Sequence, residues 1–95
     1  MGRLSKVARG KHRWIGIRGE ITINSRDELT TIFSEILENC EWKLYDFKSL
    51  DQNCLFIIKT NLKDYAKTLN LINSHVSFET LTSSGKIKLI RERIF

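Results

Sequence analysis

The stretch SRDELTTIFSEILENC, residues 25–40, decides the fold of this chain. It opens with a capping box, in which Ser25 accepts a hydrogen bond from the Glu28 amide and Glu28 reaches back to the Ser25 amide. Apolar side chains then recur at the spacing of one helix face. They are Leu29, Ile32, Phe33, Ile36, Leu37 and Cys40. The pattern predicts an amphipathic helix whose apolar face packs on another layer of the fold.

Four segments around this helix have the pattern of strands. Residues 14–21 and 42–48 alternate between apolar and polar side chains, as half-buried strands do. Residues 54–58 form a continuous apolar run, which is typical of a central strand buried on both faces. Residues 76–82 form the last predicted strand, which Ser83-Ser84-Gly85 interrupts before a basic and apolar end.

A second helix is predicted after Asn61, which caps its first turn. Its buried stripe is Leu62, Tyr65, Ala66, Leu69 and Ile72. The element order β-α-β-β-α-β favours the α+β class and a ferredoxin-like or RRM-like two-layer sandwich, with both helices on one face of an antiparallel sheet. The 95 residues allow one domain, which we assign to residues 14–95 after a basic N-terminal arm at residues 1–13.

The arm holds nearly all of the excess positive charge. Lys and Arg number 16 and Asp and Glu number 11, and the first 13 residues contain no acid. The bases of the arm are Arg3, Lys6, Arg9, Lys11 and Arg13. A basic arm on a neutral body suits a polyanion, most often nucleic acid inside cells, although a solvated terminus that only aids solubility has the same composition.

A second group of cations and several aromatic side chains extend this basic character. If Ile15 and Ile17 face the helices, the alternate positions face away from them: Trp14, Arg18, Lys43, Tyr45 and Phe47. Such a face could stack bases and hold phosphates, or be covered by another protein or by the C-terminal segment of the chain itself. Residues 54–59 lack the glycine and aromatic pattern of an RNA-recognition motif, so both interpretations stay open.

The sequence offers no catalytic or metal-binding constellation. Cys40 and Cys54 match no zinc spacing and are predicted to be reduced thiols, while His12 and His75 stand alone. We find no nucleophile with a matching base and no phosphate-binding loop, so catalysis by the chain's own side chains is not expected. No apolar run approaches the roughly 20 residues of a membrane span. We therefore expect a soluble, cytoplasmic protein without membrane contact.

Three motifs together resemble the archaeal and eukaryotic ribonuclease P protein component 2 family, the Pop-five group. Arg13-Trp14-Ile15-Gly16-Ile17 is similar to the family's opening Arg-Arg-Tyr strand, and Ile23-Asn24-Ser25-Arg26-Asp27-Glu28-Leu29 to the start of its first helix. Ser84-Gly85-Lys86-Ile87-Lys88 is similar to its Ser-Gly-Thr-Ile-Lys signature, with Lys86 at the threonine position. The resemblance covers roughly residues 13–93, and the short remainder predicts that the outer face of the sheet is less covered than in longer members.

The resemblance implies a non-catalytic RNA-binding subunit of ribonuclease P, the ribonucleoprotein endoribonuclease that removes 5′ leaders from precursor tRNA. The RNA subunit would supply the active site and its magnesium ions, and this chain would carry no cofactor of its own. Its partners would be the ribonuclease P RNA, the component 3 protein and, indirectly, precursor tRNA.

A second basic segment surrounds the last motif and completes the set of expected RNA-binding residues. It consists of Lys86, Lys88, Arg91 and Arg93. Gly85 either permits close approach of RNA or serves only as a turn. Arg13 opens an inner strand and Lys86 follows an outer one, so the two basic segments need not touch.

Two other function classes compete with this interpretation. The first is a scaffold subunit of another tRNA-processing or tRNA-modification complex, which binds protein rather than RNA. The second is a ferredoxin-like regulatory domain for a small metabolite, although no convergent polar pocket is visible in the sequence.

Overall fold

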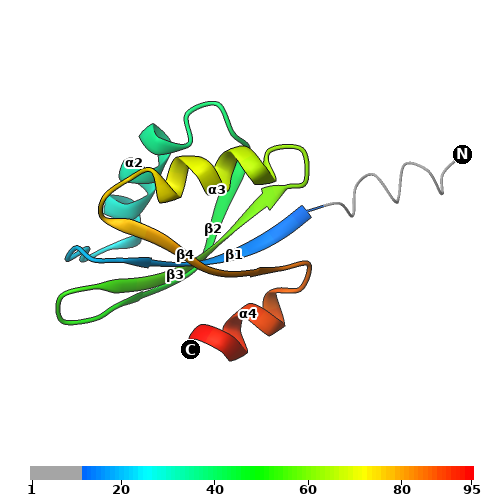
Figure 1. Ribbon diagram of the computed structural model, residues 1–95. Coiled ribbons are helices and arrows are strands. Elements are labelled where there is room, and N and C mark those ends of the chain that lie inside the picture. The colour runs from blue at the N-terminus through cyan, green and yellow to red at the C-terminus, as the bar shows by residue number, and fades with distance from the viewer. Residues whose placement is uncertain (1–11) are drawn as a thin grey trace, which may run out of the picture.

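The computed structural model describes residues 12–95 of the chain. Its elements are β1 (His12–Gly19), α2 (Arg26–Ile36), β2 (Trp42–Ser49), β3 (Cys54–Asn61), α3 (Tyr65–Asn73), β4 (Phe78–Ser84) and α4 (Ile87–Ile94). The strands form one antiparallel sheet in the order β2-β3-β1-β4. Helices α2 and α3 lie on one face, here the inner face, and α4 lies on the outer face (Figure 1). The predicted small α+β fold is confirmed.

The capping box at the start of α2 is present, with one change of partner. Ser25 Oγ accepts from the Glu28 amide at 3.2 Å, as predicted. The Glu28 carboxylate accepts instead from the Asn24 amide, at 2.9 Å. Both bonds occupy amides around the first turn that the helix itself cannot pair. The sequence therefore places the start of this helix correctly.

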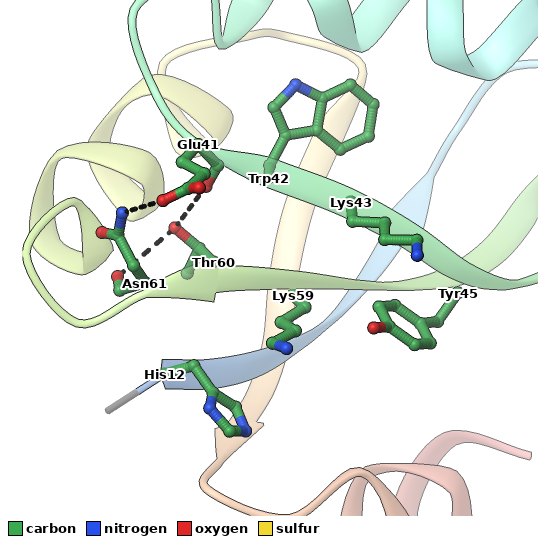
Figure 2. A pocket seen from close by; sticks show the side chains of 8 residues that line it. All are labelled: His12, Glu41, Trp42, Lys43, Tyr45, Lys59, Thr60 and Asn61. Carbon is green, nitrogen blue, oxygen red and sulfur yellow. Dashed lines mark hydrogen bonds between the residues drawn. The ribbon is translucent and has the colours of Figure 1, made fainter. Parts of the chain in front are cut away.

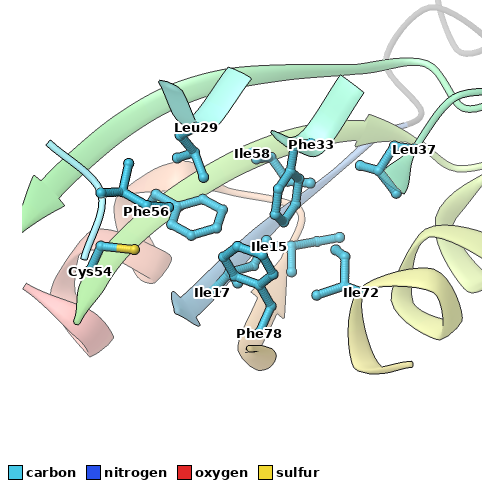
Figure 3. Close-up of a cluster of buried hydrophobic side chains, with 11 residues drawn as sticks. Ile15, Ile17, Leu29, Phe33, Leu37, Cys54, Phe56, Ile58, Ile72 and Phe78 are labelled. Carbon is cyan, nitrogen blue, oxygen red and sulfur yellow. The ribbon is translucent and has the colours of Figure 1, made fainter. Parts of the chain in front are cut away.

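The inner face of the sheet packs against α2 and α3 in the main hydrophobic core (Figure 3). Phe33 of α2 lies edge-on to Phe56 and Phe78, with ring centroids 5.1 Å and 5.0 Å away. Edge-to-face contacts of this kind add to the free energy gained by burying the rings. Leu29 and Leu37 are also buried, so the predicted apolar stripe is confirmed, although α2 itself ends at Ile36 and Leu37 is its C-cap.

The element bounds differ from the prediction at the end of the sheet where β1 begins. β1 starts at His12 rather than Trp14, and β3 continues to Asn61. Asn61 does not cap α3 directly, because its side chain accepts from the amide of Asp64, the N-cap residue, at 2.7 Å. Leu62 lies before α3 and is exposed. His12 therefore belongs to the sheet and not to the arm.

A bulge in β2 places Phe47 on the inner face, so its predicted outward orientation is wrong. The pairing with β3 shifts register between Leu44 and Asp46, and Phe47 then pairs with Phe56 and packs against the main core. One extra residue reverses the alternation of side chains beyond it. Arg26 donates to the carbonyl oxygens of Leu44 at 3.3 Å and Tyr45 at 3.0 Å, which fixes the bulged backbone.

Helix α4 covers the middle of the outer face. Ile90 is fully buried against Trp14 and Ile57. A Cβ at Gly16 would lie only 3.0 Å from Ile90 Cγ2, so the missing side chain lets the helix approach the sheet. The C-terminal segment of the chain itself therefore covers Trp14 on the outer face, which is one of the possibilities left open for the aromatic residues.

Candidate nucleic-acid interface

Basic side chains from several elements lie at the end of the sheet where β1 begins. They are His12, Arg13, Lys43, Lys59 and Lys86, which we call the basic end. Lys43 and Lys59 are directly opposite each other in the β2–β3 pairing. A Cβ at Gly85 would lie 3.6 Å from Arg13 Nη1, so the turn after β4 adjoins the start of β1. Arg13 therefore lies beside the start of the second basic segment, a proximity that the sequence had left open, because β1 and β4 are neighbours in the sheet.

No carboxylate neutralises the basic end within residues 12–95, where the ion pairs all involve other cations. The ammonium group of Lys43 lies 5.4 Å from the centroid of the Tyr45 ring, and that of Lys59 lies 5.6 Å from the centroid of Trp14. These cation–π contacts attract each ammonium group without cancelling its charge. Like charges directly opposite in a sheet are destabilising, so this pair is costly to the fold.

His12 adds an uncommitted polar atom to the same end. Burial lowers the pKa of its imidazole, and the charges of Lys59 and Arg13 lower it further. Its Nδ1 is buried and has no hydrogen-bond partner among the described residues. The half-buried ring therefore favours the neutral form, and it offers hydrogen-bonding capacity that the fold does not use.

A groove of about 440 Å³ opens between these side chains (Figure 2). It is lined by His12, Glu41, Trp42, Lys43, Tyr45, Lys59, Thr60 and Asn61. Glu41 accepts a hydrogen bond from the Asn61 side chain at 2.7 Å, and its carbonyl oxygen accepts one from Thr60 Oγ1 at 3.2 Å. Figure 2 shows the rings of His12 and Tyr45 on one side of the strands and the Trp42 ring on the other. The acid and the amide are thus already bonded, while the ammonium groups are not.

Three predicted RNA-binding arginines are instead engaged within the chain. Arg18, near the end of β1, pairs with Glu20 and with Glu79 at 3.4 Å. Arg91 of α4 pairs with Asp46, which raises the pKa of the guanidinium. Arg93 donates to Thr82 Oγ1 at 2.7 Å. These arginines fasten the far end of the sheet and α4.

The predicted stacking residues are only partly accessible. Trp14 is 9% exposed and lies edge-on to Tyr45, with ring centroids 4.5 Å apart. Because α4 covers Trp14 and Phe47 faces the core, Tyr45 is the one of the three whose ring also lines the groove. The open sheet face that stacks bases in RNA-recognition motifs is covered here.

Several predicted residues remain to be placed. The arm residues Arg3, Lys6, Arg9 and Lys11 lie outside the described residues. Lys88 is exposed in the first turn of α4. Sequence reasoning missed His12 and Lys59 as site residues. Lys59 does continue the outward positions Leu55 and Ile57, but its pairing with Lys43 depends on strand register, which one sequence does not define.

The described part of the chain shows no sign of a metal site. No three His, Cys, Asp or Glu side chains gather there in a way that could hold an ion. Cys40 and Cys54 are free thiols, and burial raises the pKa of Cys54. Between residues 12 and 95, no helix has the length and apolar character of a membrane span. Comparisons with protein-family models, curated proteins and solved structures gave no significant match.

Proposed function

We propose that the chain is a non-catalytic RNA-binding subunit of ribonuclease P, built as a ferredoxin-like sandwich and acting in the cytoplasm. It would support the catalytic RNA, which holds the magnesium ions and removes 5′ leaders from precursor tRNA, and it would pair with the component 3 protein. The observation that carries the proposal is the basic end, where five cationic or titratable side chains lie without a carboxylate partner in the described chain.

The physical role follows from the charge arrangement. Each phosphate that a lysine or arginine neutralises releases condensed counterions, and this release supplies much of the affinity of proteins for nucleic acid. A protein that binds the folded RNA better than the unfolded RNA stabilises the folded form. The basic end would act in this way on crowded phosphates, with no need for a catalytic side chain.

The positions of two resemblance motifs support the assignment. Arg13-Trp14 opens β1, and Ser84-Gly85-Lys86 follows its neighbour β4, so both motifs contribute to the basic end. Gly85 does not adopt a positive φ, and a Cβ there would meet only ordinary contact. The backbone of this turn therefore does not require glycine, and the space around Gly85 leaves room for the close approach of RNA that we propose.

A separate observation favours the second candidate, a scaffold subunit of another tRNA-processing or tRNA-modification complex. A groove on the outer face is lined by Leu50, Leu55, Leu81 and Ile94, with Arg18 and Arg93 among its polar members. Leu50 and Leu81 are 37% and 43% exposed. Apolar side chains around a groove suit contact with another protein. Such a contact is compatible with component 3 as well, so RNA binding decides between the candidates.

The test is reconstitution of a ribonuclease P RNA with component 3, followed by cleavage of precursor tRNA at limiting magnesium. Addition of this chain is expected to increase cleavage. The variant Arg13→Met/Lys86→Met should stimulate less and flatten the log–log salt dependence of RNA binding by roughly 1 per cation lost. Lys48→Met is the matched control, since Lys48 lies on the same sheet but pairs with Leu55. No gain in cleavage with the unmodified chain would reject the assignment.

A further inference from the structure

We propose that the groove at the basic end binds one unpaired nucleotide of a single-stranded RNA segment. Its phosphate would lie between the ammonium groups of Lys43 and Lys59, and its base against the rings of His12 and Tyr45. The inference rests on RNA binding as the proposed function, and it adds the kind of RNA and the residues that select it.

The charges define the place of the phosphate. Lys43 and Lys59 are opposite each other on adjacent strands, and neither has an ion-pair partner among residues 12–95. Glu41, the acid in the groove lining, is hydrogen-bonded to Asn61 at 2.7 Å. An anion between the two lysines would convert a repulsive pair into two charge-assisted contacts. The lining thus holds two ammonium groups against one carboxylate, and this net positive charge is complementary to a negative group.

Unused hydrogen-bonding capacity indicates a polar ligand next to that anion. Thr60 Oγ1 bonds to the Glu41 carbonyl at 3.2 Å and lies 3.3 Å from Thr68 Oγ1, so this hydroxyl is satisfied within the fold. His12 Nδ1 is buried and bonds no described residue. A buried polar atom without a partner costs roughly 1–3 kcal/mol. Once the His12 ring turns toward the groove, a base edge or a ribose hydroxyl beside the phosphate would satisfy this nitrogen.

The rings and the size of the groove favour a nucleotide over a simple anion. His12 and Tyr45 contribute aromatic surface next to the ammonium groups. Stacking of a base on such a ring is worth roughly 1–3 kcal/mol and tolerates any sequence. The volume of about 440 Å³ lies within the range of small-ligand pockets. Paired bases stack on one another and do not present a free face to a groove, so an unpaired nucleotide fits better than a duplex.

The binding experiment uses the full chain and short synthetic ligands. A 5′-phosphorylated single-stranded oligouridylate is titrated by calorimetry and by NMR of the histidine ring protons. A hairpin duplex, uridine, inorganic phosphate and oligoglutamate serve as comparison ligands. We expect the oligouridylate to bind best and to shift the His12 resonances. Lys43→Met and Lys59→Met should each weaken its binding about tenfold, as loss of a charge-assisted contact predicts. The control Lys48→Met, opposite Leu55, should bind normally.

Each other outcome overturns the inference. Equal binding of duplex and single strand, with equal losses in all three lysine variants, would mean diffuse attraction to phosphates. Inorganic phosphate binding as tightly as the oligouridylate would mean an anion site, and oligoglutamate binding better would mean an acidic peptide. None of these results depends on ribonuclease P RNA. The nucleotide site can therefore be rejected while the cleavage assay still supports the proposed function. Equally, the cleavage assay can reject the proposed function while the groove still binds the oligouridylate.

Discussion

The two ends of the sheet carry similar cations but balance them differently. Where β1 ends, Arg18 is matched by Glu20 and Glu79. Where β1 begins, Lys43 faces Lys59, and no described carboxylate pairs with either. Surface ion pairs contribute little to stability, but they cancel the local potential. Arg18 is thus neutralised, whereas the adjacent charges of Lys43 and Lys59 remain and are able to attract a polyanion.

This difference separates structural cations from those available for binding. Arg91 and Arg93 belong to the C-terminal basic segment, yet they fasten α4 to β2 and β4 through Asp46 and Thr82. Arg91 uses its Nε and Nη2 donors and its charge on Asp46, whereas Arg93 uses one nitrogen, Nη1, on Thr82 and the Ser83 carbonyl. A count of basic residues along the sequence therefore assigns too many RNA-binding residues to α4, and it misses Lys59.

Ile90→Ala is expected to have the largest effect on stability, and it tests whether the cations of α4 are structural rather than RNA-binding. Ile90 is fully buried between α4 and the sheet, and such truncations cost about 2–5 kcal/mol. We expect a loss near the lower limit, because α4 packs on the sheet through a small cluster, in which Ile90 contacts Trp14 and Ile57. The measurement is urea unfolding together with amide exchange in α4. No α4 residue lines the groove at the basic end, but Tyr45 packs in the same cluster as Ile90, so oligouridylate affinity should fall much less than the free energy of unfolding.

The control for this variant is Leu89→Ala on the same helix, at a position that is 37% exposed. It should leave the free energy of unfolding almost unchanged. A comparable loss of oligouridylate affinity in Ile90→Ala at a temperature where the sheet is folded would contradict the separation, since α4 would then belong to the binding surface.

Phe47→Ala and Tyr45→Ala form the next comparison, because the bulge places these two rings on opposite faces. Phe47 packs against the main core but is only half-buried, so we expect a loss of about 2 kcal/mol, below that of a fully buried ring. RNA binding should remain. Tyr45→Ala should instead weaken oligouridylate binding. The measurements are thermal unfolding and calorimetric titration, and a binding loss confined to Phe47→Ala would invalidate the face assignment.

Phe47 also shows where sequence reasoning stops. Local patterns were sufficient for the Ser25 cap, for the buried stripe of α2 and for the central strand, because each depends on neighbours along the chain. The bulge depends on Arg26 reaching the carbonyls of Leu44 and Tyr45 across 18 and 19 positions of sequence, which no local pattern reveals. Predicting the groove would have required the β2–β3 register, and predicting that the outer face is covered would have required the docking of α4. Long-range pairing was thus the missing information.

A smaller effect is expected from pH, through His12. Its pKa is lowered from 6.5, so below that value the unfolded chain binds more protons and stability declines as pH falls. A bound phosphate favours the protonated ring, so RNA affinity should rise over the same range. The groups facing His12 are Arg13, Lys59, Asn61 and, across the groove, Lys43 and Glu41.

The measurement is oligouridylate affinity and urea unfolding between neutral and mildly acidic pH. Protonated His12 should steepen the log–log salt dependence by roughly 0.7, the value for one further phosphate contact on a single strand. His12→Gln should abolish both pH dependences. His75→Gln is the control, since His75 lies near Phe78 and does not line the groove. An unchanged pH dependence in His12→Gln would assign the titration to another group.

The smallest expected effect is on the free energy of unfolding of Lys43→Met, and it is informative because the variant should be more stable. Lys43→Met keeps an unbranched side chain over Tyr45 but removes the charge opposite Lys59. Because like charges opposite each other destabilise a sheet, the variant should be more stable than the unmodified chain by about 0.2–0.5 kcal/mol in low salt. Urea unfolding in low and high salt measures the gain, which screening should reduce. The matched change Lys48→Met removes a charge that is also exposed but faces Leu55, and it should give no such gain. A lysine whose removal stabilises the fold but weakens RNA binding is retained for its ligand, whereas equal stability changes in both variants would mean that the basic end carries no special strain.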